Sequence, residues 1–349
     1  MTTPERAGPG LASVIDPFIV GLLVCASLGL LIPARGIAAS AVDVLKTAAI
    51  ALLFFLQGVR LQRAAVIAGM THWRLQLLTL VATFVLFPIL GLLLHAVFPA
   101  ALDRVLWLGV LYLCTLPSTV QSSIAFTSIA RGNVPAAICA ATASNLIGIV
   151  LTPVLVASLL NLHGGSTSPL EEIESIVLQL LVPFIAGQVL SRWLRPWALR
   201  HAVLLTVSDR GSILLVVYAA FSAATLSGAW RDVRWPQLLQ LLLISVFLLA
   251  VALSATRLAS RAAGFSREDE IATVFCGSKK SLATGVPMAN ILFPPAAAGL
   301  IILPVMLFHQ IQLMACAYLA RRYAATAPAG TPGAAPAARA GLRTDHRSG

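Results

Sequence analysis

Charged residues are scarce in this chain of 349 residues. They form 11% of the sequence, hydrophobic residues form 58%, and the mean hydropathy is +0.90. Soluble domains carry about 25% charged residues, so the composition excludes an ordinary soluble protein. Three long stretches (75–102, 105–130 and 281–320) hold no Asp, Glu, Lys or Arg. Because a helix needs roughly 20 apolar residues to cross a bilayer, the sequence predicts an all-α polytopic membrane protein.

Motifs of catalysis and of cofactor binding are also absent. The chain holds no P-loop, GxGxxG, HExxH or Ser/His/Asp arrangement. Its five cysteines lie in apolar segments without metal-ligand spacing, which favours free buried thiols over disulfides or zinc. The net charge of +11 comes from cations placed between apolar runs, a pattern that sets membrane topology and does not favour nucleic-acid binding. We therefore expect no enzyme activity, no cofactor and no nucleic-acid partner.

Ten apolar segments are predicted to cross the membrane as two groups of five. A polar N-terminus (1–14) precedes the first group (15–162), a linker (163–175) separates it from the second group (176–322), and a tail (323–349) is predicted to be disordered. The segments lie at about 17–33, 38–59, 75–98, 105–130, 134–160, 176–189, 211–230, 235–256, 270–292 and 297–320.

The arginines predict the orientation of these segments. With ten spans both termini lie on one side of the membrane, and sixteen arginines fall on that side against four on the other. Because cytoplasmic loops carry the excess of Lys and Arg, we expect both termini in the cytoplasm. The expected location is the plasma membrane, of the bacterial inner-membrane type.

Short sequence matches indicate that the two groups of five are related. PFIVG (17–21) returns as PFIAG (183–187), and TPVL (152–155) is echoed by LPVM (303–306). The polar interruption of the fourth segment, 114–123, pairs with an interruption of the ninth. Since five is an odd number, the second copy must be inverted in the membrane. Inverted repeats with paired broken helices are typical of secondary transporters, whose site lies where the breaks meet.

The interruption of the ninth segment carries two adjacent lysines. Lys279 and Lys280 are flanked by Gly277, Ser278, Ser281 and Thr284 in an otherwise apolar region. A cation within a bilayer is costly and normally faces a cavity or a partner, although lysines near a helix end can instead extend to the interface. Non-helical backbone at membrane depth is tolerated where it is buried or lines a cavity, so we expect a discontinuous helix that forms a polar site.

Three motifs carry a family resemblance. They are PSTVQSSIAFTSIARGN (117–133), FCGSKKSLATGVPMANILFP (275–294) and LPVMLFHQIQL (303–313), within a match over about 12–322. They resemble the bile acid:sodium symporter family, in its branch typified by solute carrier family 10 member 7. The resemblance implies two inverted five-helix repeats with crossing discontinuous helices 4 and 9, a panel of spans 1, 2, 6 and 7, and a core of the others. It also implies alternating-access transport of a small organic anion across the lipid bilayer.

The sequence departs from that family at its sodium ligands. Alignment on Gly277 puts Phe275 at the position of a glutamate that serves both sodium ions and Lys279 at that of a glutamine. Thr83 occupies the position of another glutamine of the family, and Ser122 and Ser123 occupy the positions of a Ser-Asn pair. These replacements argue against sodium coupling. We interpret Lys279 as the better placed of the two lysines, acting as a fixed substitute for the ion, as a proton carrier or as a partner for an anionic solute.

The predicted binding residues share polar side chains near the two breaks and in the tenth segment. Several have a structural alternative: Ser and Thr can bond to helix backbone, and Asn can join helices. His309 and Gln312 share one helix face, which fits either a cavity or a structural pair. The set comprises Ser118, Thr119, Gln121, Ser122, Ser123, Asn145, Ser278, Lys279, Lys280, Ser281, Thr284, Asn290, His309 and Gln312.

Two other functions are compatible with such a cluster. A membrane regulator derived from a transporter would bind a solute without moving it. A membrane enzyme would use a Ser–Lys pair, with a desolvated lysine that activates Ser278 or Ser281. Uptake into proteoliposomes distinguishes the transporter from the regulator, and release of cleaved products would indicate the enzyme.

Overall fold

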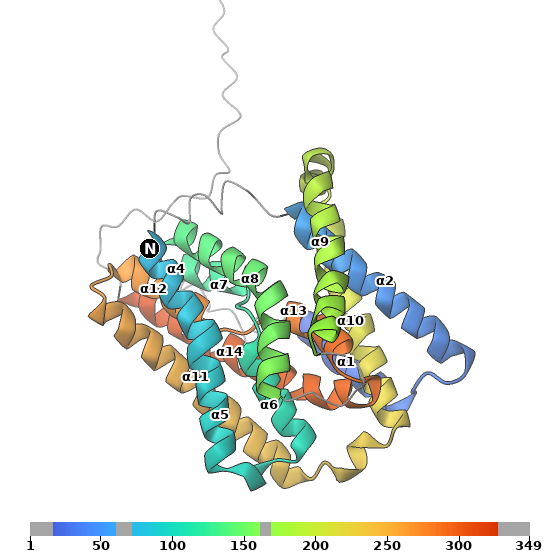
Figure 1. The fold of residues 1–349 in the computed structure, drawn as a ribbon. Helices are drawn as coiled ribbons and strands as arrows, with labels where there is room; N and C mark the ends of the chain where they lie inside the picture. The colour runs from blue at the N-terminus through green and yellow to red at the C-terminus, as the bar shows by residue number, and fades with distance from the viewer. Residues whose placement is uncertain (1–16, 61–71, 161–168, 327–349) are drawn as a thin grey trace, which may run out of the picture.

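Every regular element in the described part of the chain is a helix. The computed structural model describes residues 17–60, 72–160 and 169–326, and their arrangement is drawn in Figure 1. The predicted all-α class is therefore confirmed over these ranges. The polar N-terminus (1–14), most of the tail (327–349) and part of the linker (163–168) lie outside the described residues.

Most predicted segments correspond to one helix. These are α1 (Pro17–Leu31), α2 (Ile37–Arg60), α8 (Val134–Leu160), α9 (Pro169–Arg200), α10 (Ala202–Leu226), α11 (Trp235–Ala262) and α14 (Pro295–Ala325). The third segment consists of α4 (Trp73–Val81), a π-helical turn η3 (Ala82–Leu86) and α5 (Phe87–Val97). Two short 3-10 turns, η4 (Pro99–Ala101) and η5 (Ala229–Asp232), connect longer helices.

The fourth and ninth segments are broken, as predicted. The fourth consists of α6 (Arg104–Thr115) and α7 (Gln121–Ile129), and the ninth of α12 (Arg267–Gly277) and α13 (Leu282–Leu292). Pro117 lies two residues after the end of α6 and has no backbone N–H, so it cannot continue the helix. Ser281 caps α13 by accepting a hydrogen bond from the Thr284 N–H at 3.2 Å.

Three helices extend beyond the predicted bounds of their segments. Helix α9 begins at Pro169, inside the predicted linker, because Pro in the first turn followed by acidic residues suits a helix N-terminus. Helix α10 begins at Ala202 and not at 211, so Asp209 and Arg210 lie within it. Helix α14 continues to Ala325, past the predicted start of the tail.

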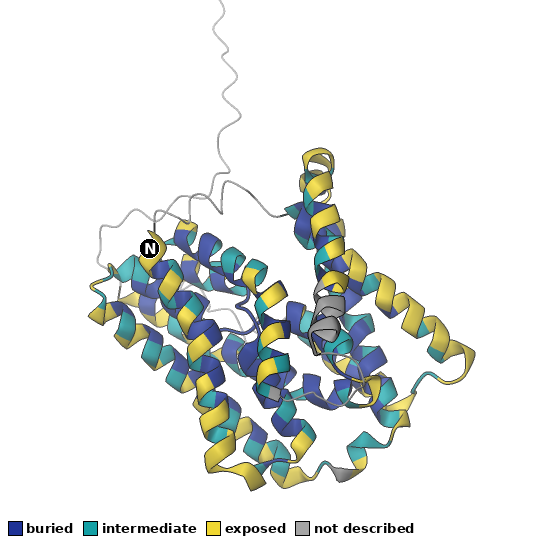
Figure 2. Cartoon of the chain, viewed as in Figure 1, coloured by how far each residue is buried: buried dark blue, intermediate teal, exposed yellow. Residues whose placement is uncertain are grey.

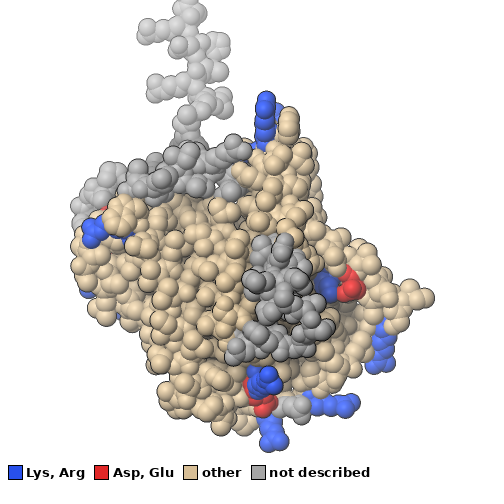
Figure 3. Space-filling model, viewed as in Figure 1, with Lys and Arg blue, Asp and Glu red and all other residues tan. Residues whose placement is uncertain are grey.

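The outer surface of the molecule is largely apolar. Figure 2 places exposed residues on the outer faces of the helices, and Figure 3 shows broad areas without Lys, Arg, Asp or Glu. Within the described ranges, six helices are long and apolar enough to cross a membrane, and α1 and α6 are shorter apolar helices. A large exposed apolar surface is stable only against another apolar phase, which agrees with the predicted membrane location.

The helices pack as two groups. Helix α10 packs on α1 and α2, and α2 also packs along α9, so these four lie together at one side (Figure 1). In the other group α14 contacts α6 and α13, and α11 contacts α12, while α10 also packs on α14 and α13 and so joins the two groups. At the α2–α9 crossing, a Cβ atom on Gly58 would lie 2.1 Å from the Phe184 carbonyl oxygen, and one on Gly187 would lie 2.0 Å from that of Phe55. Glycine permits this backbone contact because it has no side chain.

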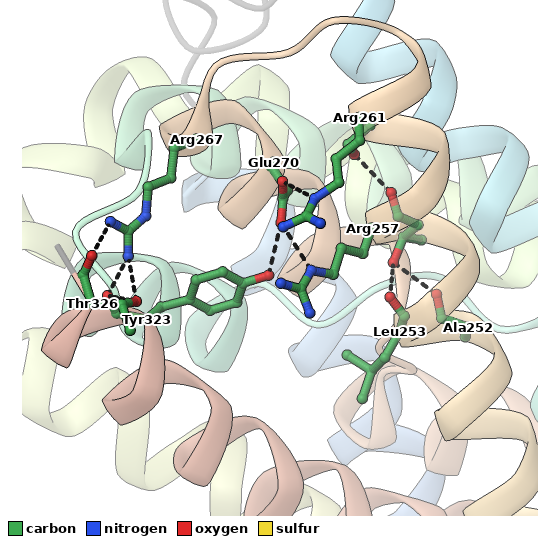
Figure 4. A network of polar contacts seen from close by, with 10 residues as sticks. Ala252, Leu253, Arg257, Arg261, Arg267, Glu270, Tyr323 and Thr326 are labelled. Atoms are coloured by element: carbon green, nitrogen blue, oxygen red, sulfur yellow. Dashed lines mark hydrogen bonds and ion pairs between the residues drawn. The ribbon is translucent and has the colours of Figure 1, made fainter.

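A polar cluster joins the ends of α11, α12 and α14 (Figure 4). The carboxylate of Glu270 accepts hydrogen bonds from Arg261 Nε at 2.9 Å, Arg257 Nε at 3.3 Å and the Tyr323 hydroxyl at 3.1 Å. Arg267 Nη2 donates to the Tyr323 carbonyl at 2.5 Å. The buried carboxylate is thus fully paired, and the three helix ends are held together beside the breaks.

Candidate functional site

The two helix breaks meet, and each donates hydrogen bonds to backbone carbonyls of the other. The Ser281 N–H donates to the Pro117 carbonyl at 2.8 Å. The Ser118 hydroxyl donates to the Cys276 carbonyl at 2.5 Å, and the Ser123 hydroxyl to the Phe275 carbonyl at 2.9 Å. Buried backbone groups need partners, so each break supplies what the other lacks.

Carbonyls 114 to 118 are all satisfied in this way. Thr152 donates to the Thr115 carbonyl at 2.9 Å, and Asn145 Nδ2 donates to the Ser118 carbonyl at 2.6 Å. Lys280 Nζ serves the carbonyls of Cys114 and Leu116, both at 2.8 Å. These five consecutive carbonyls therefore all have partners, and a lysine of the ninth segment is part of the structure of the break.

The third carbonyl bound by Lys280, that of Thr83, has no backbone partner because of the π-helical turn. The Phe87 N–H bonds to the Ala82 carbonyl in this turn. The next carbonyl, that of Thr83, would take its bond from residue 88, which is a proline without an N–H. Lys280 Nζ donates to the Thr83 carbonyl at 2.7 Å instead. The ammonium thus replaces the hydrogen bond that Pro88 cannot make.

Lys280 is held firmly in this position. Its ammonium, 1% exposed, also lies 4.2 Å from the centroid of the Phe87 ring. Its backbone N–H and carbonyl both bond to the Gln312 amide, at 2.9 Å each. Three carbonyl oxygens around one ammonium match its three N–H donors. Lys280 is therefore a resident cation in a cage of backbone oxygens.

Lys279 lies in a different environment. It is 0% exposed, so neither lysine extends to an interface. Its ammonium has no hydrogen-bond partner in the described chain, and it lies 4.0 Å from the centroid of Phe126 and 5.4 Å from that of Phe275. The carbonyl cage thus belongs to Lys280, whereas Lys279, predicted to be the better placed cation, contacts aromatic faces.

A cavity of about 820 Å³ lies beside the meeting point of the breaks. Thr119 hydrogen-bonds to Ser122 at 2.8 Å on one part of its wall. On another part, Thr284 donates to Asn145 Oδ1 at 2.9 Å. Half of the predicted binding residues line this cavity: Thr119, Gln121, Ser122, Asn145, Ser281, Thr284 and His309.

The other predicted residues lie off the cavity wall. Ser278 bonds to the Val274 carbonyl at 2.6 Å and Asn290 Nδ2 bonds to the Val286 carbonyl at 3.0 Å, so each bonds within its own helical segment. Gln312 is buried and links His309 Nδ1, at 2.9 Å, to the backbone of Lys280. The remaining four, Ser118, Ser123, Lys279 and Lys280, pack at the breaks behind the wall.

The predicted site set missed the charged part of the cavity wall. Arg60 of α2 pairs with Asp209 of α10, and Arg210 lies 5.3 Å from the centroid of Phe18. Arg321 from the end of α14 also lines the cavity. Each of these residues lies at a helix end or at a predicted span boundary, where a charged residue ordinarily faces the interface. Only the packing of α2, α10 and α14 brings them to one cavity.

The serines of the ninth break do not pair with a lysine. The Ser278 hydroxyl donates to a carbonyl of its own helix, and the Ser281 hydroxyl donates to Thr284 at 3.0 Å. Three carbonyls bind the Lys280 ammonium. A Ser–Lys pair requires the two side chains within hydrogen-bond reach, and these contacts leave neither serine in that arrangement.

Other acid, histidine and cysteine side chains are dispersed. Within the ranges that the structure describes, no three His, Cys, Asp or Glu side chains gather as metal ligands. Four of the five cysteines are buried, and all are free thiols. Asp43 and Lys46, three residues apart on α2, form an ion pair at 2.5 Å.

Known proteins resemble this chain along most of its length. The profile of the SBF-like CPA transporter family matches residues 16–325. An uncharacterised protein of Pseudomonas aeruginosa is 55% identical over 309 residues, which cover 88% of this chain and 93% of that protein. A protein of Escherichia coli named "Putative symporter YfeH" is 51% identical over 313 residues, 90% and 94% of the two chains.

A vertebrate relative is more distant. Sodium/bile acid cotransporter 7 of Rattus norvegicus is 29% identical over 308 residues, which cover 85% of this chain and 89% of that protein. The family profile and these relatives confirm the resemblance carried by the three motifs. This chain belongs to the SBF-like CPA transporter family, within the bile acid:sodium symporter superfamily and its member-7-like branch.

Proposed function

We propose that this membrane transporter moves a small organic anion by alternating access. The observation that carries the proposal is the cavity between the two helix groups. Phe18, Gln57 and Phe184 contribute to its wall from α1, α2 and α9, and Asn145 and Thr284 contribute from α8 and α13. A volume of about 820 Å³ is within the usual range for small-molecule sites. Movement of one helix group against the other would open and close this space.

The charge on the cavity wall supports an anionic solute. Arg60, Arg210 and Arg321 line the cavity, and Asp209 is the acidic residue among its lining residues. A cleft with an excess of one charge attracts ligands of the opposite charge, more strongly in surroundings of low dielectric. Carboxylates, sulfate esters and phosphate esters share this chemistry, and guanidinium groups bind them well.

We infer that the chain crosses the membrane ten times, with two inverted repeats. The paired breaks of the fourth and ninth segments support this arrangement. The charged cavity residues lie near the start of α10 and the ends of α2 and α14, which is the side of the termini. With cytoplasmic termini, this charged part of the cavity wall lies toward the cytoplasm. A reporter fused after Arg322 should be active only in its cytoplasmic form, and a periplasmic signal would contradict the topology.

We infer that transport does not depend on sodium. The Lys280 ammonium takes three carbonyl oxygens at the meeting of the breaks, and Phe275 places a buried ring where the family resemblance puts a carboxylate. A second cation would be repelled: two unit charges 4 Å apart interact by about 4 kcal/mol at an effective dielectric of 20. The residues present therefore do not fit a sodium ion beside Lys280.

Uptake by proteoliposomes tests the proposal. Cholate, a sulfate ester and a small dicarboxylate should be tested as radiolabelled solutes in sodium and in choline buffers. We expect saturable uptake of at least one of them at equal rates in both buffers. Ala125→Trp fills the cavity and should stop uptake, whereas Ser128→Trp, on an exposed position of the same helix α7 away from the wall, should not.

Three outcomes would contradict the proposal. Saturable binding without uptake would favour the regulator. Cleavage of a solute would favour the enzyme. A large, saturable dependence of uptake on sodium would refute the assigned role of Lys280.

A further inference from the structure

The adjacent lysines of the ninth break differ in how their ammonium groups are satisfied. Lys280 has three carbonyl partners, whereas the buried Lys279 ammonium has no hydrogen-bond partner in the described chain. An ammonium without acceptors is costly to bury. The break itself is completed by Lys280, so the fold does not use the donors of Lys279. A ligand that supplies acceptors would satisfy them.

An aromatic ring separates Lys279 from the cavity. Phe126 of α7 lines the cavity, and the centroid of its ring is 4.0 Å from the Lys279 ammonium. Phe275 of α12 also contacts this ammonium, at 5.4 Å, but it is 0% exposed and does not line the cavity. Phe126 is therefore the cover between the ammonium and the cavity.

The surroundings of Lys279 allow the ammonium to be uncovered. Its backbone lies in the non-helical segment between α12 and α13. The titratable groups that interact with it are the thiols of Cys276 on α12 and Cys316 on α14. Neither is a carboxylate that would hold the ammonium in place. Rotation of the half-buried Phe126 ring would bring the ammonium to the cavity wall.

We propose that Lys279 is a covered binding position for an oxyanion, and that the Phe126 ring covers it when no ligand is bound. The ligand is the carboxylate, sulfate ester or phosphate ester of the solute, so this inference rests on the proposed function. An oxyanion offers the acceptors that the ammonium lacks, in charge-assisted hydrogen bonds. Because the ligand binds the uncovered state only, it shifts the protein toward that state.

Acylation of lysines, read by mass spectrometry, tests the cover without any transport assay. The chain has three lysines, Lys46, Lys279 and Lys280, so each modified site is resolved. Lys279 of the wild type can be acylated only in the uncovered conformation, and minor conformations are populated at about 0.1–10%. Phe126→Ala removes the cover, so it should raise the acylation rate of Lys279 by about tenfold or more. Lys280, held by three carbonyls, should stay protected. Phe275→Ala is the matched control because it removes a ring from the same ammonium away from the cavity.

Protection by anions tests the ligand. In the Phe126→Ala protein, cholate or inorganic sulfate should slow acylation of Lys279, whereas mannitol at equal concentration should not. Phe126→Leu, which keeps more of the apolar volume, should give the same order of effects if the alanine variant unfolds. Unchanged Lys279 acylation in both Phe126 variants, an equal rise in Phe275→Ala, or no protection by either anion would overturn the inference. Protection without uptake would leave it standing and contradict the transport function alone.

Discussion

Replacement of each lysine by methionine should affect stability differently: Lys280→Met should destabilise the protein and Lys279→Met should not. Lys280→Met keeps an unbranched side chain but removes the donor from three buried carbonyls, those of Thr83, Cys114 and Leu116. Each unpaired carbonyl costs about 1–3 kcal/mol, or about 3–9 kcal/mol for three. The avoided cost of burying an ammonium offsets several kcal/mol of this. We expect a net loss of about 3–5 kcal/mol, similar to that for removal of one partner of a buried ionic group.

Lys279→Met should be neutral or stabilising. The ammonium makes no hydrogen bond in the described chain, so the substitution loses only its contacts with Phe126 and Phe275. Such cation–π contacts contribute about 0.5–2 kcal/mol, and the cost of burying the charge disappears at the same time. The two variants are matched, since they differ by one position and have the same chemistry.

Thermal unfolding of the detergent-solubilised proteins measures the difference. Both variants should be followed in one buffer by loss of the monodisperse peak on size exclusion, with the wild type beside them. We expect Lys280→Met to unfold at a much lower temperature and Lys279→Met at or above the wild-type midpoint. Equal destabilisation of the two, or a Lys280→Met protein as stable as wild type, would refute the assignment of the carbonyl cage.

Four further predictions follow from contacts in the structure. Lys280→Ala should regain part of its lost thermal stability with n-propylammonium, which refills the carbonyl cage; equal rescue by sodium chloride would contradict this. The Gly58→Ala protein should unfold at a lower temperature than the wild type, because the new Cβ atom would lie 2.1 Å from a carbonyl oxygen. Gly211→Ala is the control: its Cβ atom would have nothing within 4 Å, so it should stabilise the protein by up to about 1 kcal/mol. Similar unfolding midpoints for the two variants would refute the close α2–α9 contact. Asp209→Asn removes the acidic partner of Arg60 and makes the charged part of the cavity wall more positive. KM for an anionic solute should therefore fall while kcat changes little. A higher KM would contradict the attraction of anions by this wall. Glu270→Gln should lower the free energy of unfolding by only about 1 kcal/mol, because the side chains of its two arginine partners are 48% and 56% exposed. The difference from the wild type should shrink in high salt. A large loss of stability that salt does not change would contradict this prediction.

The class of the protein and the position of its breaks could be predicted from local sequence. Uncharged runs of sufficient length indicate membrane helices, because every backbone polar group in a bilayer must be satisfied within the protein. Pro117 cannot continue α6, and the small polar residues around Gly277 favour a break in the ninth segment. Both features act within a few residues of the chain, so periodicity and composition reveal them.

The distinction between the two lysines could not be predicted in this way. Lys279 and Lys280 have the same neighbours in sequence, yet the cage of Lys280 depends on Thr83, which is 197 residues away. That carbonyl is available only because the π-helical turn before Pro88 leaves it without a donor. Family alignment favours Lys279 by position, but an alignment does not give the direction of a side chain in non-helical backbone, so it does not tell which ammonium occupies the carbonyl cage.

The charged wall of the cavity likewise depends on the tertiary structure. From sequence alone, Arg60 and Arg321 follow apolar runs and indicate interfacial ends of helices. The predicted seventh segment begins at about 211, so Asp209 and Arg210 lie at its edge. The packing brings these residues to one cavity wall, where Arg60 of α2 pairs with Asp209 of α10. The sequence alone therefore determined the all-helical membrane class and where two of the segments break, because these depend on local composition. Which polar groups meet at the breaks was decided only by the packing of helices far apart in the chain.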